Sequence, residues 1–161
     1  MLLMSNVHER EFAATREEIG DLLRTVAGPD DKVWPKGWPP IRFDRELQVG
    51  ARGGHGPIRY WISEYEPERR VEFTFDRKTG AEGTHAFDLL PGSRPGRALL
   101  RHTVIARPTT LTMRLGWPLV VRWLHDACVE DIFDQVQRSL GQPVKHPNHK
   151  SLYVRAMRLA L

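Results

Sequence analysis

Three histidines, His85, His102 and His125, stand at positions that the surrounding pattern places on apolar faces. Neutral imidazole carries one hydrogen-bond donor and one acceptor, and it titrates near neutral pH. These side chains can therefore bind the polar end of a ligand or act as general acid and base. Two other interpretations stay open: each ring is a core histidine with a local hydrogen bond, or the three form a zinc site, which requires ligand distances of ~2.0–2.1 Å. We predict no metal and no cofactor.

A predicted hairpin of residues 83–90 and 97–107 carries two of these histidines, with a proline- and glycine-containing turn at residues 91–96 between its strands. Pairing His85 with His102 brings both rings to one face. Side chains alternate along a strand, so a slip of one residue would turn the apolar set outward. This register predicts a cavity face that also carries Phe87, Leu89, Leu100 and Val104, with Phe87 opposite Leu100 and Leu89 opposite Ala98.

The third histidine lies in a helical pattern from Thr109 to Leu140, which the Gly-Trp-Pro segment at residues 116–118 is expected to bend or break. A helix of this kind would cover the same apolar space as the hairpin. Its apolar stripe comprises Val121, His125, Cys128, Ile132 and Val136. Its opposite face, which we expect to meet water, comprises Asp126, Glu130, Asp134 and Gln137.

Cys128 lies three residues after His125, close enough on a helix for a Cys–His nucleophile pair. The sequence shows no third group that would orient the base. A buried cysteine usually behaves as a small hydrophobic side chain, and we prefer that interpretation. Glu64 and Asp126 are weaker acid–base candidates, which we expect to be solvated or paired.

The elements before the hairpin follow from local patterns. Residues 6–13 alternate as a first strand, and Thr15 with Glu18 forms a capping box that begins a short helix. The proline-rich segment 28–42 excludes a regular helix or central strand. Two interpretations of its tryptophans, Trp34 and Trp38, stay open: they fold back onto the core for their apolar area, or they line the mouth of a pocket.

A series of strands without intervening helices predicts an antiparallel meander. Phe73 and Phe75 share one face of the third strand in this series. The predicted strands cover residues 41–49, 58–66 and 71–76, followed by the hairpin, and a glycine-rich loop is expected at residues 50–56.

The length of 161 residues is that of one domain. A single cysteine excludes an internal disulfide and favours the cytoplasm, and no run approaches the ~18 apolar residues of a membrane span. The net charge of +4 lies wholly in residues 142–161, which hold four basic residues and no acid. We therefore predict a domain of residues 1–141 that folds without its basic tail, a short helix within that tail, and no nucleic-acid binding.

The order of strand, helix, proline-rich loop, strands and long amphipathic helix resembles the START-like (helix-grip, SRPBCC) superfamily. This superfamily includes polyketide cyclases, lipid-transfer domains and birch-pollen-allergen-type proteins. The resemblance covers residues 5–140 and is carried by residues 59–67 running into 71–75, residues 83–89, and the helix at 118–140. It implies an α+β fold in which a curved antiparallel sheet of six to seven strands wraps around a long C-terminal helix. A short helix follows strand one, and a hydrophobic cavity lies between sheet and helix.

Our leading hypothesis is a protein that binds a small hydrophobic or aromatic molecule, lipid or polyketide-like, in this cavity. The alternative is an enzyme of the polyketide cyclase, aromatase or dehydratase kind, with the three histidines moving protons. A second alternative is a protein–protein adaptor that uses the tail and the tryptophan loop, and a homodimer stays open. The side chains expected to contact the small molecule are Trp34, Trp38, Phe73, Phe75, His85, Phe87, Leu100, His102, Val121, His125 and Cys128.

Overall fold

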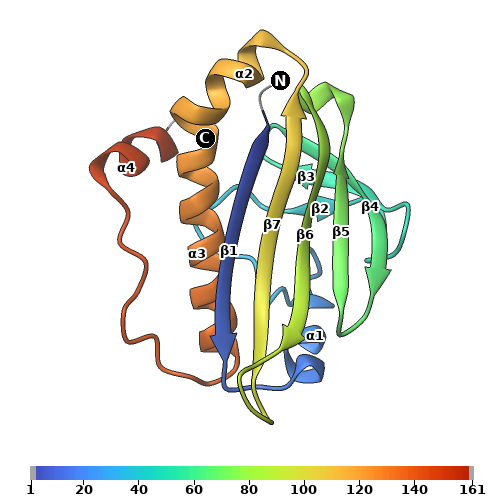
Figure 1. Ribbon diagram of the computed structural model, residues 1–161, viewed down its shortest axis with the longest axis vertical. Coiled ribbons are helices and arrows are strands. Elements are labelled where there is room, and N and C mark those ends of the chain that lie inside the picture. The colour runs from blue at the N-terminus through green and yellow to red at the C-terminus, as the bar shows by residue number, and fades with distance from the viewer. Residues whose placement is uncertain (1–2, 160–161) are drawn as a thin grey trace.

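The computed structural model describes residues 3–159, which form one seven-stranded sheet and the helices packed on it (Figure 1). No helix in this range has both the length and the apolar character needed to cross a bilayer. The elements are β1 (Met4–Phe12), α1 (Arg16–Leu23), β2 (Arg42–Phe43), β3 (Arg52–His55), β4 (Ile58–Glu66), β5 (Arg70–Phe75), β6 (Ala81–Pro91), β7 (Ala98–Pro108), α2 (Leu111–Gly116), α3 (Arg122–Ser139) and α4 (Leu152–Arg158).

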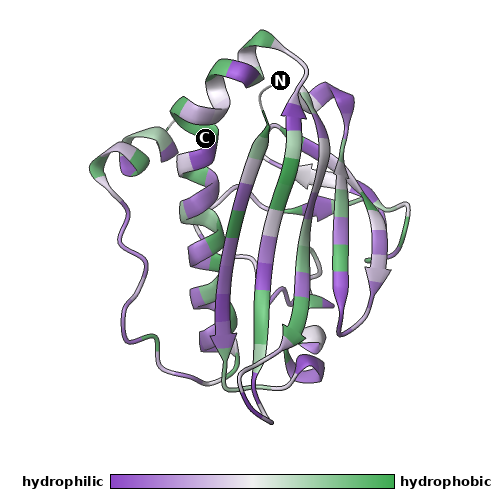
Figure 2. Ribbon diagram, viewed as in Figure 1, coloured by the Kyte–Doolittle hydropathy of each residue, from purple (hydrophilic) through white to green (hydrophobic). Residues whose placement is uncertain are grey.

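The sheet is antiparallel throughout and has the order β1-β7-β6-β5-β4-β3-β2. It curves beside α3, which lies along the β1 edge (Figure 1). Hydrophobic and hydrophilic residues alternate along the long strands, as one buried face requires (Figure 2). The predicted fold, a curved antiparallel sheet with a long C-terminal helix and a short helix after strand one, is confirmed.

The capping box at the start of α1 is formed as predicted. The Glu18 backbone N–H donates to Thr15 Oγ1 at 3.2 Å, and the Thr15 N–H donates to a Glu18 carboxylate oxygen at 2.7 Å. Two free N–H groups of the first turn are thereby satisfied. The apolar stripe that follows is buried against the sheet, through Ile19, Leu22 and Leu23.

The strand predicted at residues 41–49 is wrong for most of its length, because β2 has only two residues. The Asp44 carboxylate accepts the backbone N–H of Arg52 at 2.9 Å, so a side-chain hydrogen bond closes the ladder at this point. Beyond Asp44 the chain continues in bends and a turn as far as Gly50.

The loop predicted at residues 50–56 is also wrong, because it contains β3. A Cβ atom at Gly54 would lie 1.9 Å from the carbonyl oxygen of Ile58, and the φ of Gly54 is +149°. Only glycine tolerates both the close strand approach and this backbone conformation. The glycines that suggested a loop therefore permit a tightly bent strand.

β6 and β7 pair two residues away from the predicted register. His85 lies opposite Val104, and His102 lies opposite Phe87, so the predicted His85–His102 rung is wrong. A slip of two residues keeps every side chain on its predicted face, and the apolar pattern therefore cannot distinguish the two registers. The observed register is set by the six-residue loop 92–97. A backbone hydrogen bond of 3.0 Å between the first and last residues of this loop closes it.

The predicted long helix forms over residues 111–139, and its geometry changes at Gly-Trp-Pro, where it was expected to bend or break. α2 ends at Gly116, a π turn follows over Trp117–Val121, and α3 begins at Arg122. Pro118 lacks the N–H that a continuous helix would use, and a wider turn accommodates it. The apolar stripe of α3 turns inward as predicted and buries Cys128, Ile132 and Val136.

The opposite face of α3 packs on β1, so the predicted water-facing side is wrong. Arg10 donates to Asp134 at 2.7 Å and to Glu130 at 2.9 Å. The two ring nitrogens of His8 lie 2.7 Å from Glu130 and 3.1 Å from Asp126. Polar side chains on every second residue of β1 thus meet polar side chains on every turn of α3. We call this contact the β1–α3 seam; it comprises Asn6, His8, Arg10, Asp126, Glu130, Asp134 and Gln137.

After α3 the chain runs back beside that helix to α4 (Figure 1). Val154 of α4 is buried, and Lys150 pairs with Asp131 of α3 at 2.8 Å. The Arg158 guanidinium lies 4.6 Å from the ring centroid of Trp38. Residues 142–159 therefore contact both α3 and the tryptophan loop. The division at residue 141 stays a prediction.

Candidate functional site

A cavity of about 290 Å³ lies between the concave face of the sheet and the segment from α2 to α3. Of the residues that the sequence predicts to contact a ligand, only Leu100 is not at its wall; it is fully buried in the core instead. Those that line the cavity are Trp34, Trp38, Phe73, Phe75, His85, Phe87, His102, Val121, His125 and Cys128.

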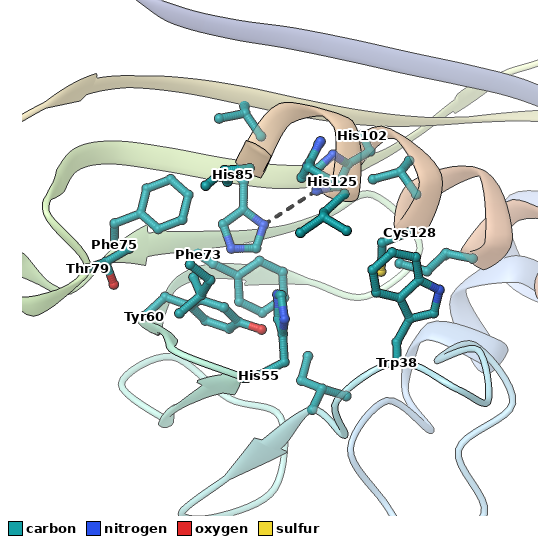
Figure 3. Close-up of a pocket in the computed structure, with 18 of the residues that line it drawn as sticks. Trp38, His55, Tyr60, Phe73, Phe75, Thr79, His85, His102, His125 and Cys128 are labelled. Atoms are coloured by element: carbon teal, nitrogen blue, oxygen red, sulfur yellow. Dashed lines mark hydrogen bonds between the residues drawn. The ribbon is translucent and has the colours of Figure 1, made fainter. Parts of the chain in front are cut away.

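His85 and His102 are diagonal neighbours in this wall. Nδ1 of His85 lies 3.4 Å from Nε2 of His102, the contact that is dashed in Figure 3. The outer nitrogens, Nε2 of His85 and Nδ1 of His102, are buried and have no hydrogen-bond partner among residues 3–159. Aromatic rings also hold His85: Phe73 and Phe75 stack on it with centroids 4.7 and 5.0 Å away.

His125 approaches the pair from the helix side, as the sequence predicts. Its ring centroid is 4.9 Å from that of His102, and its Nδ1 also has no hydrogen-bond partner in the described part of the chain. Asp126, the next residue, belongs to the β1–α3 seam and lies 3.8 Å from this nitrogen. The three predicted histidines therefore form a row that runs from the sheet across the cavity wall to the helix.

Burial keeps the cavity imidazoles neutral. It lowers the pKa of His85 and of His102 well below the ordinary value, and the nearby His125 ring adds to the effect. Burial also lowers the pKa of His125, although Asp126 opposes this shift. Neutral rings can accept and donate hydrogen bonds at the same time, which protonated rings cannot.

Two polar residues of the cavity wall, His55 and Tyr60, were not predicted from the sequence. His55 was assigned to the loop at residues 50–56, whereas it ends β3 and packs on Trp34 with centroids 4.9 Å apart. Burial lowers the pKa of His55 to about 4 and raises that of Tyr60 above its ordinary range. Tyr60 lies two residues from Ile58 and two from Ile62 in β4, so the three side chains share one face. This spacing was the available signal that Tyr60 points inward.

Cys128 lies within the wall beside the apolar stripe. Its thiol is buried, and burial raises its pKa above the ordinary value. A thiol held in the neutral form is a poor nucleophile. The preferred interpretation, a small hydrophobic side chain, matches this environment.

Among residues 3–159, the one group whose ligand atoms all lie within 4.8 Å of one another and could hold a metal comprises His8, His125 and Asp126. Hydrogen bonds that His8 donates to Asp126, and then to Glu130, raise its pKa to about 9. A protonated imidazole has no lone pair for a metal. His8 and Asp126 are therefore paired with each other in an ion-pair network that joins the cavity wall to the seam.

No protein-family model and no curated protein matches this chain. Solved structures do. CalU16 from Micromonospora echinospora is 16% identical, with 97% of this chain and 82% of that one aligned and a TM-score of 0.58. Norcoclaurine synthase from Thalictrum flavum is 11% identical over 88% of each chain, with a TM-score of 0.66. A protein from Thermobifida fusca is 11% identical over 91% of this chain and 99% of that one, with a TM-score of 0.63.

The chain has the helix-grip fold. In this helix-grip protein, one wall of the cavity comes from the sheet and another from the helical residues 113–132, so residues far apart in sequence meet across it. Trp34 and Trp38 lie against this cavity, and the Trp38 indole donates to Asp131 at 2.8 Å. Trp38 is buried and Trp34 is half-buried, so these side chains do not form the exposed contact surface that the adaptor hypothesis requires.

Proposed function

We propose that the protein binds a compact, uncharged aromatic molecule that carries a hydroxyl or carbonyl group. The observation that carries this proposal is a pair of ring nitrogens, on His85 and His102, that have no partner among residues 3–159 and lie in a mainly apolar cavity. Burying polar atoms without partners is costly, so a ligand that hydrogen-bonds them would be favoured.

The His85–His102 contact restricts which groups fit. If His102 Nε2 donates to His85 Nδ1, the free His85 nitrogen is a donor and the free His102 nitrogen is an acceptor. If His85 Nδ1 instead donates to His102 Nε2, the free His85 nitrogen is the acceptor and the free His102 nitrogen is the donor. In either arrangement the neutral pair offers one donor and one acceptor. A hydroxyl or an enolisable carbonyl matches this pair, whereas a buried carboxylate or ammonium would lack a compensating charge.

The cavity volume and a fold relative support the ligand class. About 290 Å³ lies at the small end of the ~300–1,000 Å³ of ligand pockets, which favours one or two fused rings over a two-chain lipid. Norcoclaurine synthase, which shares the fold at 12% identity over 89% of this chain, has been solved in complex with dopamine and hydroxybenzaldehyde, two aromatic molecules.

A test uses 2-naphthol and naphthalene, which differ by one hydroxyl group, and follows binding by tryptophan fluorescence. The wild type should prefer 2-naphthol roughly tenfold, which corresponds to about 1.4 kcal/mol for the hydrogen-bonded hydroxyl. His102→Phe should erase this preference and keep or slightly raise stability, because an apolar ring replaces a buried polar one.

A matched control is Thr103→Val, on the other face of the same strand, which should bind both molecules like the wild type. Native mass spectrometry of the purified protein would add the identity of any co-purified molecule. Equal affinity of the wild type for naphthol and naphthalene would refute the proposal. So would a loss of roughly 1–3 kcal/mol of stability in His102→Phe with binding unchanged, which is the signature of a purely structural pair.

A second candidate function, proton transfer in a cyclase- or dehydratase-like reaction, is favoured by the same free nitrogens. One imidazole could take a proton from a carbon beside a carbonyl while the other donates to the carbonyl oxygen. Transfer of one proton across the 3.4 Å contact between the rings would then return both to the neutral form, with their donor and acceptor roles exchanged. Deuterium exchange at the α-carbon of 2-tetralone, followed by NMR, tests this. The wild type should exchange this deuterium at least roughly tenfold faster than His85→Phe. Identical rates in the two proteins would contradict proton transfer and leave ligand binding as the only proposed function.

A further inference from the structure

The segment from α2 to the start of α3 is apolar on two opposite faces. Its inner face lines the cavity through Met113, Trp117 and Leu124. Its outer face carries an apolar side chain at every fourth residue, and each is at least half exposed: Leu111 (70%), Leu115 (56%), Leu119 (61%) and Trp123 (50%). Residues four apart form one ridge along a helix. A helical segment apolar on both sides lacks the polar face that normally meets water.

α4 extends this ridge sideways. The Tyr153 hydroxyl donates to the carbonyl oxygen of Leu119, and the Tyr153 and Trp123 rings lie edge to face with centroids 6.4 Å apart. Leu152, at the start of α4, is 80% exposed. Figure 2 shows hydrophobic segments on both α2 and α4 at this end of the molecule. We call the combined surface the apolar ridge: Leu111, Leu115, Leu119, Trp123, Leu152 and Tyr153.

The charge around the ridge is mainly positive. Residues 109–125 and 142–161 together hold six basic side chains and no acidic side chain. Arg122 pairs with the neighbouring Asp126 at 3.9 Å. Lys150 is paired with Asp131 and Arg158 stacks on Trp38. The exposed guanidinium groups that flank the ridge are those of Arg114, Arg122 and Arg155.

We propose that the apolar ridge and its flanking arginines dock the protein on the surface of an anionic lipid bilayer. Apolar side chains enter the headgroup region, tryptophan and tyrosine favour its boundary, and arginine pairs with lipid phosphates. A second copy of the chain fits less well, because a two-fold contact through this surface would bring like charges together. Nucleic acid would leave the leucines exposed.

Docking at this surface would place a wall of the cavity against the bilayer. The segment that meets the lipid on its outer face meets the cavity on its inner face, through a single helical layer. An uncharged aromatic molecule dissolved in the bilayer would thus lie one side-chain layer from the site. The docking proposal does not depend on the identity of the ligand, and it is tested without one.

The test is co-sedimentation of the full chain with vesicles of pure phosphatidylcholine and with vesicles of an equal mixture of phosphatidylcholine and phosphatidylglycerol. We expect strong binding to the mixture only. Arg114→Glu with Arg155→Glu should weaken it at least roughly thirtyfold, since each basic residue near an anionic surface contributes about fivefold. Leu115→Ser with Leu119→Ser should weaken it comparably.

Matched controls lie elsewhere on the molecule. Val7→Ser alters an outward-facing side chain of β1 that is 53% exposed, and Arg69→Glu reverses an exposed charge in the β4–β5 turn. Both should bind vesicles like the wild type. Equal binding to the two vesicle types, or ridge variants that match the controls, would overturn the proposal. It would also be overturned by a concentration-dependent dimer in analytical ultracentrifugation that Leu115→Ser abolishes, since the ridge would then be a self-association surface.

Discussion

Lowering the pH from about 6.5 to about 5 is expected to destabilise the protein strongly, because the cavity requires neutral imidazoles. Burial lowers the pKa of His85 and His102 well below 6.5 and that of His55 to about 4. Above pH 6.5 these rings are neutral in both the folded and the unfolded chain, so they do not make stability depend on pH. Below it, only the unfolded chain binds the protons.

The size of this effect follows from proton linkage. Each such histidine lowers the free energy of unfolding by about 1.4 kcal/mol for every pH unit below 6.5. Three histidines together give about 4 kcal/mol per pH unit, against a total stability of ~5–15 kcal/mol for a typical domain. Urea denaturation at stepped pH measures the slope. His102→Phe should reduce it by about a third.

His8 supplies an internal check of the sign. Its pKa is raised to about 9 by hydrogen bonds with Asp126 and Glu130, so its contribution is complete below pH 6.5 and is lost as the pH rises through 9. His8→Gln should therefore flatten the alkaline limb of the stability curve and leave the acid limb as in the wild type. A wild-type stability that is constant between pH 5 and 6.5 would contradict the prediction.

Ile132→Asp is expected to prevent folding under ordinary conditions. Ile132 is 3% exposed, on the inward stripe of α3. A carboxylate at this position would lose both an apolar contact and its own hydration, at a cost above about 4 kcal/mol. Circular dichroism with thermal denaturation would show the loss of the cooperative transition.

The matched control is Arg138→Gln, on the exposed side of the same helix, which should change stability by less than about 0.5 kcal/mol. Glu130→Ala, harmless if this side of α3 were solvated, should cost roughly 1–3 kcal/mol, because Glu130 pairs with both His8 and Arg10. The expected order of damage is Ile132→Asp, then Glu130→Ala, then Arg138→Gln. An Arg138→Gln variant more damaging than Glu130→Ala would contradict the observed packing of α3 on β1.

Features that depend on neighbouring residues could be predicted from the sequence. The Thr15–Glu18 capping box begins α1, and Gly-Trp-Pro interrupts the long helix. The alternation in β6 and β7 places His85 and His102 on the cavity face. Each of these patterns acts within a few residues, where cap geometry, proline and the two-residue repeat of a strand have the same effect in any fold.

Other features were decided only by tertiary structure. The register of His85 and His102 differs from the predicted one by two residues, a change that leaves the apolar pattern intact and depends on the hairpin loop. Glycines predicted to form a loop serve close strand approach in β3, since only the neighbouring strand defines the space at Gly54. This strand brings His55 to the cavity.

The polar side of α3 shows the difference most clearly. By itself, a helix face with Asp126, Glu130 and Asp134 is typical of a surface in contact with water. In the fold it lies on β1, whose Arg10 and His8 come from more than a hundred residues earlier in the chain. A single helix pattern cannot distinguish water from a complementary polar strand, because both satisfy the same charges. The sequence by itself therefore determined the elements and their inward faces, whereas the pairing of distant charges required the assembled sheet and helix.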